Sequence, residues 1–270
     1  MSSVLEYRYV RSNDVPGGLF MVTKDGEKPF IPSMRECRSI PLHYSDNVVD
    51  IGAYMGQYSI RCARFPVTKV TAYEPTPSSY QILTGLKLPN FKPINAAIVG
   101  NAREEATLHV SSGIGVTNST IFSFSNKKAI TVPAVKYSDA TKDATIVKID
   151  VEGGEYNFHI EDNFPDSLRA LIIDFHPVSQ YRWLEEAKEI VLAIEREGFT
   201  SVISPDWSNE WARAGSWMRE RDLPDVTNPM LDGIVCCGCG EIIDSIGKSL
   251  CINCWKRWSK RHRRGYNLAS

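Results

Sequence analysis

The sequence predicts an α/β fold with a mostly parallel sheet and helices on both of its faces. Short apolar runs that are typical of buried strands alternate with helical segments between residues 48 and 203. The first of these runs breaks at two glycines and leads directly into a helix. Because parallel strands need crossover connections, usually helices, these two observations favour a parallel sheet that is covered on both sides.

The composition suits one sizeable domain with a small appendage. The chain has 270 residues, 43% of them hydrophobic and 23% charged. Its formal net charge is −1, but residues 236–270 carry +5 and residues 1–235 carry −6. We predict three parts: an N-terminal extended or hairpin cap at 1–45, a main domain at 46–235 and a basic C-terminal module at 236–270.

Composition also bears on the compartment. No apolar run approaches the roughly 20 residues that a membrane helix needs, and residues 1–20 lack the pattern of a secretory signal. Five of the seven cysteines lie within residues 236–254, which favours metal binding in a reducing compartment over a disulfide scaffold. We therefore expect a cytoplasmic protein without membrane contact.

The elements are predicted from apolar periodicity and turn residues. Extended segments are expected at 5–10 and 19–23 in the cap. In the main domain, strands are expected at 48–51, 69–74, 93–99, 106–110, 130–135, 145–149, 168–175, 199–203 and 232–235, and helices at 58–65, 77–86 and 183–197. The last helix is the clearest, because its apolar residues recur at spacings of three and four. They are Leu184, Ala187, Val191 and Ile194.

Two long connections are candidates for function. Residues 111–120 form a polar loop of small residues, which is either functional or a solvated connection. Residues 205–230 carry three tryptophans in a polar setting. They predict a lid or substrate loop, or else a loop whose aromatic residues pack on the body.

The turn from Asp50 to Gly56 is a ligand-binding candidate. A glycine turn between a strand and a helix lets a ligand approach bare backbone at the helix N-terminus. The spacing Asp-x-Gly-x-x-x-Gly differs from the Gly-x-Gly-x-x-Gly of dinucleotide-binding folds and from a phosphate loop that ends in Gly-Lys-Ser/Thr. An ordinary tight turn is the alternative.

Three blocks of the chain together resemble the FkbM-type methyltransferases. The blocks are Val49-Asp50-Ile51-Gly52-Ala53 with Gly56, Tyr58 and Ser59; Ala72-Tyr73-Glu74-Pro75 with Pro77; and Val147-Lys148-Ile149-Asp150-Val151-Glu152-Gly153 with Glu155. The resemblance covers about residues 45–205. It implies the Rossmann-like class I methyltransferase fold with a seven-stranded sheet, binding of S-adenosylmethionine (SAM), and methyl transfer, mostly to hydroxyl oxygens.

The chemistry of these residues agrees with a SAM site. Glu74, at the carboxyl end of the second strand, is placed to accept both hydroxyls of a ribose, or is a surface acid in a turn. Asp50 would accept from the ammonium of the methionine part, directly or through water, or would cap the helix. The predicted SAM-binding residues are Asp50, Gly52, Ala53, Gly56, Tyr58, Glu74, Pro75 and Asp150.

Catalytic residues are expected near the transferred methyl. An alcohol must lose its proton, and a positioned base contributes about 10²–10⁴-fold. His176 is the first candidate, a position where the resemblance also implies a histidine; Asp150 is the alternative base, and a structural histidine is the other alternative. Asp150 and Glu152 flank the turn after the strand at 145–149, and Glu152 is the third catalytic candidate. Asn118 and Ser119 are expected to line the acceptor side.

Motifs of two other methyl-acceptor classes are missing. No Pro-Pro-aromatic motif of the kind found in enzymes that methylate base amino groups follows the strand at 145–149. No Pro-Cys pair offers the nucleophile for methylation of a cytosine carbon. A hydroxyl acceptor is thereby favoured.

Four cysteines predict a structural zinc site. Cys236 and Cys239 are followed, after eleven residues, by Cys251 and Cys254. Four thiolates in two such knuckles suit tetrahedral zinc, which would stabilise this segment by roughly 10–16 kcal/mol. A redox disulfide pair is the alternative, and Cys237 is a spare thiol or an alternative ligand.

A basic, aromatic segment follows the cysteines and predicts contact with nucleic acid or another anionic partner. Its members are Trp255, Lys256, Arg257, Trp258, Lys260, Arg261, Arg263 and Arg264. A solvated tail is the alternative.

The leading hypothesis is a SAM-dependent O-methyltransferase. Its acceptor would be a hydroxyl of a sugar, nucleotide or nucleic acid, recruited by the zinc module and basic tail. One alternative is a small-molecule O-methyltransferase whose zinc module stabilises the fold or forms a dimer. Another is a non-catalytic nucleic-acid-binding protein on a methyltransferase fold.

Overall fold

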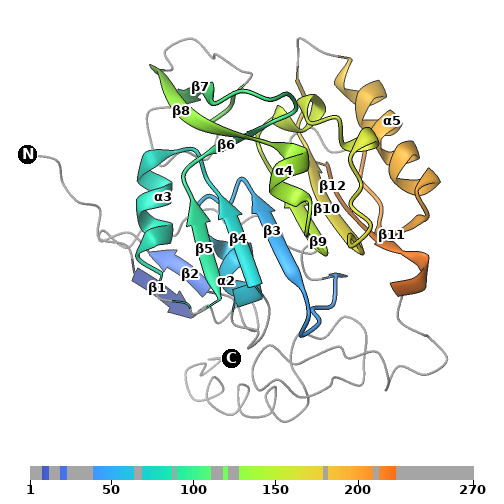
Figure 1. Ribbon diagram of the computed structural model, residues 1–270, viewed down its shortest axis with the longest axis horizontal. Coiled ribbons are helices and arrows are strands. Elements are labelled where there is room, and N and C mark those ends of the chain that lie inside the picture. Colours follow the sequence, from blue (N-terminus) through green and yellow to red (C-terminus); the bar gives the residue numbers. More distant parts are fainter. Residues whose placement is uncertain are drawn as a thin grey trace, which may run out of the picture. The chain divides into compact units, whose positions relative to one another are not determined.

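The computed structural model describes residues 8–11, 19–22, 39–63, 69–86, 88, 90–110, 118–120, 128–178, 182–208 and 213–222 (Figure 1). The chain divides into two compact units, Tyr44–Leu223 and a second unit of Met1–His43 with Pro224–Ser270. In the second unit, β1 (Arg8–Arg11) and β2 (Leu19–Val22) pair antiparallel. These strands overlap the two extended segments predicted at 5–10 and 19–23.

A seven-stranded sheet is the centre of the first unit. Its strands, in chain order, are β3 (Asn47–Ile51), β4 (Lys69–Tyr73), β5 (Phe91–Ile94), β9 (Ile146–Ile149), β10 (Ala170–Phe175), β11 (Phe199–Ile203) and β12 (Arg213–Arg219). They are arranged in the order β11-β12-β10-β9-β3-β4-β5. The strands from β10 to β5 run parallel, and β12 is antiparallel to both of its neighbours. The predicted mostly parallel, seven-stranded sheet is confirmed.

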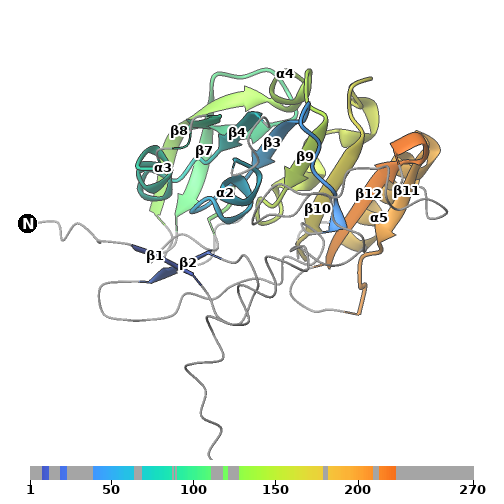
Figure 2. The same ribbon diagram turned by 90° about the horizontal axis from the view of Figure 1, so that it is seen from below.

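Helices cover both faces of this sheet. α2 (Gln57–Ala63) and α3 (Pro77–Thr84) lie on one face, and α4 (Tyr137–Thr141) and α5 (Trp183–Arg196) lie on the other (Figures 1 and 2). On the face of α5, alternate strand residues meet apolar helix residues in the main core. These residues are Val49, Ile51, Val147, Ile149, Leu171, Ile173, Phe175, Ala187, Ile190 and Ile194. The predicted amphipathic helix at 183–197 is thus confirmed.

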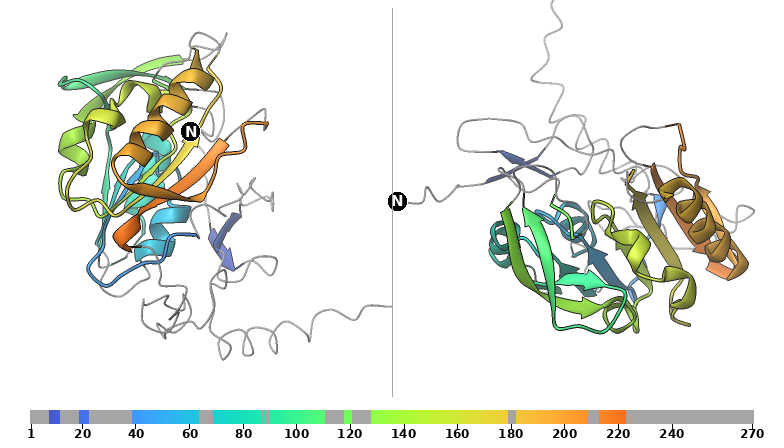
Figure 3. Two further views of the ribbon diagram at one scale, coloured as in Figure 1. Left: turned by 90° about the vertical axis from the view of Figure 1, so that its right-hand side faces the viewer. Right: turned by 90° about the horizontal axis from the view of Figure 1, so that it is seen from above.

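A second sheet of three strands contains β6 (Ala97–Val99), β7 (Glu105–Val110) and β8 (Lys128–Lys136), in the order β6-β8-β7. It lies above the carboxyl ends of β4 and β5 (Figures 1 and 3). The prediction of one strand at 93–99 is wrong, because the chain leaves the main sheet at Asn95. The Asn95 side chain donates to the carbonyl oxygens of Glu74 and Pro75, and this anchor separates β5 from β6.

The predicted loop at 205–230 contains β12, so the prediction is wrong for Arg213–Arg219. Trp217 and Met218 are fully buried and point to opposite faces of the sheet, which stabilises a strand inside a polar-looking sequence. Trp207 packs 5.8 Å from the ring of Phe175. The aromatic residues described in this segment therefore pack on the body. Trp211 and the strand predicted at 232–235 lie outside the described residues.

Candidate active site

The carboxyl ends of β3, β4, β9 and β10 meet at one edge of the parallel sheet. In open α/β sheets, ligands bind at this edge. The turns that follow these strands carry Gly52, Glu74, Asp150 and His176. The predicted SAM-binding and catalytic residues on these turns are therefore brought to one edge of the sheet.

The glycine turn (residues 52–56) follows β3 and requires both of its glycines. Gly52 and Gly56 have φ of 76° and 87°, and Tyr54 between them has φ of 50°. A Cβ at Gly52 would overlap the carbonyl oxygen of Asp150, so no other residue fits there. The backbone N–H groups of Gly52 and Ala53 both donate to the carbonyl oxygen of Tyr73, at 3.0 Å. The turn is thus fixed against β4 and β9.

Glu74 follows β4 and is 5% exposed, so the alternative of a surface acid is wrong. Its carboxylate oxygens accept the backbone N–H groups of Tyr54 and Thr76, at 2.8 and 2.7 Å. Burial raises the pKa of Glu74 to about 7, although these donors counteract the rise. The Thr76 side chain also hydrogen-bonds this carboxylate. Because a carboxylate offers about four lone-pair sites, capacity remains for a further donor such as a ribose hydroxyl.

Asp50 is fully buried beneath the glycine turn. The Ser59 hydroxyl of α2 donates to Oδ2 at 2.6 Å, and the Lys148 ammonium lies 3.4 Å from Oδ1. Tyr58 is also buried, at the start of α2. The structure therefore gives both residues supporting positions in the wall of the site, and contact of Asp50 with the SAM ammonium stays a prediction.

Lys148 links the glycine turn to the turn that follows β9, a role that the sequence reasoning missed. Its Nζ donates to the carbonyl oxygen of Gly52 at 3.1 Å and lies 3.2 Å from Oδ2 of Asp150. Burial favours the neutral form of Asp150, but the positive charges of Lys148 and His176 outweigh it and lower the pKa of this carboxyl. The available signal was a lysine between Val147 and Ile149, since lysine is rarely buried without a partner.

His176 lies next to the predicted acids, immediately after β10. Its side chain is 12% exposed, with Nε2 3.7 Å from Glu152 and 3.8 Å from Asp150. Burial alone would lower the pKa of His176, but the carboxylates of Glu155, Glu152 and Asp174 raise it well above its ordinary value. These carboxylates therefore favour the protonated form of the imidazole in the free protein.

Glu155 and Tyr156 orient His176, and the sequence reasoning assigned neither of them a role. Glu155 is fully buried and accepts the backbone N–H groups of His176 at 2.7 Å and of Gly153 at 3.0 Å. Its Oε1 lies 3.4 Å from Nδ1 of His176. The Tyr156 hydroxyl donates to the His176 carbonyl oxygen at 2.9 Å. The acidic turn (residues 150–155) and Tyr156 thus hold the imidazole with Nε2 toward Asp150 and Glu152.

A bridging segment (residues 118–120) connects the SAM side to the acidic turn. The Asn118 amide donates to the Thr76 hydroxyl at 2.9 Å, and the Ser119 hydroxyl donates to the Glu152 carbonyl oxygen at 2.8 Å. The sequence reasoning expected Asn118 and Ser119 on the acceptor side. The structure places them between the loop that carries Glu74 and the turn beside His176.

One cluster at this edge has the donor types of a divalent-cation site. Asp150, Asp174 and His176 offer three ligand atoms within 4.8 Å of one another, and carboxylate and imidazole are common ligands of such ions. The predicted zinc ligands Cys236, Cys239, Cys251 and Cys254 lie outside the described residues. The basic segment at 255–264 does so as well.

The sheet order, the glycine turn and the acidic turn define the class I methyltransferase-like α/β fold. A family model described as the methyltransferase FkbM domain matches residues 50–201, more than half of the chain. The chain therefore belongs to the FkbM methyltransferases, a SAM-dependent family. No curated protein matches the chain.

Solved methyltransferase structures are similar at low sequence identity. A SAM-dependent methyltransferase from Agrobacterium tumefaciens is 8% identical with a TM-score of 0.45, covering 81% of this chain and 72% of that one. TYW2 from M. jannaschii, in complex with AdoMet, is 16% identical with a TM-score of 0.43, over 81% and 89%. An rRNA methylase from Streptococcus thermophilus is 11% identical with a TM-score of 0.41, over 68% and 93%.

Within the part of the chain that the structure describes, no helix is long and apolar enough to cross a membrane.

Proposed function

We propose that this protein transfers the methyl group of SAM to a hydroxyl oxygen of an acceptor. The observation that carries the proposal is Glu74, a buried carboxylate with remaining acceptor capacity, held beside the glycine turn at the ligand-binding edge of the sheet. This arrangement suits a ribose diol next to bare backbone. The acidic turn and His176 follow β9 and β10, which lie on the other side of β3 from β4.

The glycine turn and the loop after β4 would hold SAM. The tight turn that contains Gly52, Ala53 and Gly56 would border the methionine part of SAM, while Glu74 and Pro75 would border the ribose. Excess negative charge at Asp150 and Glu152 favours a cationic ligand nearby. SAM carries its methyl on a positively charged sulfur, from which the methyl is displaced in line.

His176 would accept the proton of the acceptor hydroxyl. In the free protein the surrounding carboxylates favour the protonated form of the imidazole. A cationic ligand beside Asp150 and Glu152 offsets these carboxylates and lowers the pKa of His176, so the basic form appears when the site is filled. As the carbon–sulfur bond breaks and the oxygen–carbon bond forms, the hydroxyl proton moves to Nε2. Asp150, whose pKa is lowered, is the weaker candidate.

The C-terminal module would recruit the acceptor. Its paired Cys-x-x-Cys spacing supports a structural zinc held by Cys236, Cys239, Cys251 and Cys254. The tryptophans and basic residues at 255–264 have the chemistry for stacking on bases and neutralising phosphates. This combination favours a sugar hydroxyl of a nucleotide or nucleic acid as acceptor.

Transfer of labelled methyl from SAM tests the proposal. The full chain is incubated with a nucleic-acid fraction or with a metabolite fraction. The labelled product is then digested and identified by chromatography and mass spectrometry, which distinguish O-methylated from N-methylated products. We expect label on oxygen in the nucleic-acid fraction. Label in small metabolites alone supports the small-molecule enzyme, and SAM binding without transfer to either fraction contradicts catalysis.

A further inference from the structure

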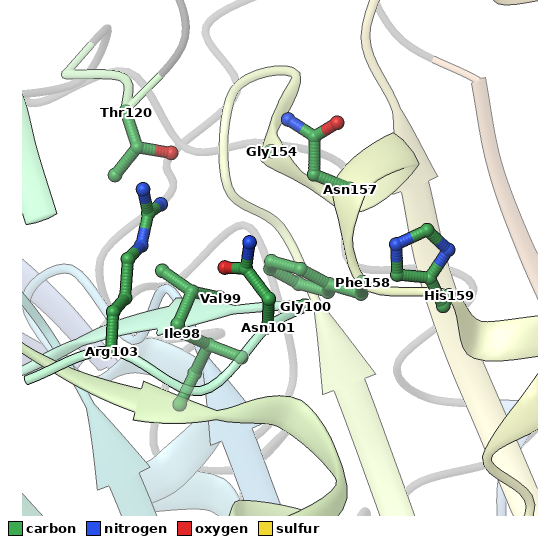
Figure 4. A pocket seen from close by; sticks show the side chains of 10 residues that line it. All are labelled: Ile98, Val99, Gly100, Asn101, Arg103, Thr120, Gly154, Asn157, Phe158 and His159. Atoms are coloured by element: carbon green, nitrogen blue, oxygen red, sulfur yellow. The ribbon is translucent and has the colours of Figure 1, made fainter.

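A polar pocket lies between the β6–β7 connection and η1 (Gly154–Asn157), next to the acidic turn. Its volume is about 200 Å³, smaller than the roughly 300–1,000 Å³ of sites that enclose a whole drug-sized ligand. It is lined by Ile98, Val99, Gly100, Asn101, Arg103, Thr120, Gly154, Asn157, Phe158 and His159 (Figure 4). The size suits one small group of a larger molecule.

The lining offers hydrogen-bond donors and one permanent cation. The Arg103 guanidinium points toward Thr120 on one side, and Asn157 and His159 lie on the other (Figure 4). No acidic side chain is among the lining residues, although Glu161 lies 3.6 Å from Nδ1 of His159 at the exposed rim. A donor set built around arginine matches the geometry of phosphate and carboxylate groups.

The walls of the pocket are held by direct backbone packing. A Cβ at Gly100 would overlap the carbonyl oxygen of Asn157, so the β6–β7 connection and η1 touch without an intervening side chain. Phe158 and Val99 beneath them are buried. The polar groups above this floor are therefore carried on a fixed frame.

The bridging segment couples this pocket to the candidate active site. A Cβ at Gly154 would lie 3.4 Å from the Thr120 hydroxyl, so Thr120 packs against the start of η1. The preceding residue, Ser119, is bonded to the Glu152 carbonyl oxygen. One side of the 150–157 region thus faces His176, and the other lines the pocket.

The two sides of the 150–157 region are bordered by opposite charges. Asp150, Glu152 and Glu155 surround His176, and an anionic acceptor would be repelled there. Arg103 supplies the opposite charge across the turn. An anion held in the pocket would keep its charge off the acid cluster.

We propose that this pocket binds a small oxyanion group, a phosphate or a carboxylate, of the methyl acceptor. The assignment to the acceptor rests on the proposed methyltransferase function. The oxyanion chemistry rests on Arg103 and the donor lining alone.

Titration of the full chain with inorganic phosphate, at ionic strength held constant with chloride, tests the proposal. The backbone amide signals of Gly100 and Gly154 are followed by two-dimensional NMR, with acetate as the second probe. We expect saturable shifts of both signals, and the tighter of the two probes identifies the group. Arg103→Gln should weaken binding at least about tenfold, the loss expected for a charge-assisted hydrogen bond. Arg182→Gln, an exposed arginine elsewhere in the unit, should change nothing.

Unsaturable shifts, or equal binding by the Arg103→Gln protein, overturn the oxyanion site. SAM binding by the same variant is measured in parallel and should equal that of the wild type, which shows that the fold is intact. If phosphate binds but the wild type does not bind SAM, the oxyanion site stands and its assignment to a methyl acceptor is overturned.

Discussion

Replacing Glu74 with Gln should weaken SAM binding about 10- to 150-fold. Each carboxylate oxygen accepts one backbone N–H, from Tyr54 at 2.8 Å and from Thr76 at 2.7 Å. An amide keeps the shape but replaces one oxygen with a donor, so one backbone N–H and one ribose hydroxyl lose their acceptor. Hydrogen bonds to charged groups are worth about 1.5–3 kcal/mol, and 1.4 kcal/mol is tenfold in Kd.

Isothermal titration calorimetry with two ligands makes this measurement specific. S-adenosylhomocysteine has the same ribose as SAM but lacks the methyl group and the positive charge on sulfur. Because Glu74 is expected to contact the ribose, the variant should weaken both ligands by the same factor. Glu189→Gln, on the exposed side of α5, serves as the matched control and should bind as the wild type does. A loss below about threefold, or a loss confined to SAM, would refute the reasoning.

Three further predictions follow from the same geometry. Burial raises the pKa of Glu74 to about 7. Because the ionised form accepts the ribose hydroxyls, SAM affinity should fall about tenfold from pH 8 to pH 6. Calorimetry across this range should show a smaller change of affinity with pH for Glu74→Gln. His176→Asn should lower kcat by about 10²–10⁴-fold with the Kd for SAM nearly unchanged, and unimpaired single-turnover rates would remove it as the base. Gly52→Ala and Gly198→Ala both place alanine at positive φ, which costs about 1–2 kcal/mol of stability. A Cβ at Gly52 also meets Asp150 whereas one at Gly198 meets open space, so thermal melts should show the larger loss for Gly52→Ala, and equal melts would contradict the packing.

The fold class was predictable because local and global signals agree. The three motif blocks sit on β3, β4 and β9, and the strands that carry them are buried on both faces, so short apolar runs were sufficient to locate them. The place of Glu74 at the ligand-binding edge of the sheet was also predictable, since an acid at the end of a parallel strand lies at that edge.

Other elements depended on contacts that are distant in sequence. The break between β5 and β6 is fixed by Asn95, which bonds the loop after β4. β12 is stabilised between β10 and β11, and its own residues alternate poorly. Neither pattern is visible in a window of local sequence.

The supporting residues of the site were missed for a related reason. Lys148 and Glu155 act on groups in other turns, and a single sequence does not show which turns meet. Lys148 meets the Gly52 carbonyl oxygen because β3 and β9 pair side by side. The zinc and nucleic-acid predictions at 236–264 stay predictions.

Calorimetric titration of the wild-type chain with SAM tests the central claim most directly. The account predicts saturable binding of one SAM per chain, with an affinity that falls about 10- to 150-fold on Glu74→Gln. S-adenosylhomocysteine, which has the same ribose, should bind with an affinity of the same order. A wild-type protein that is folded by its thermal melt and yet releases no heat of binding, with no SAM retained in equilibrium dialysis, would contradict it.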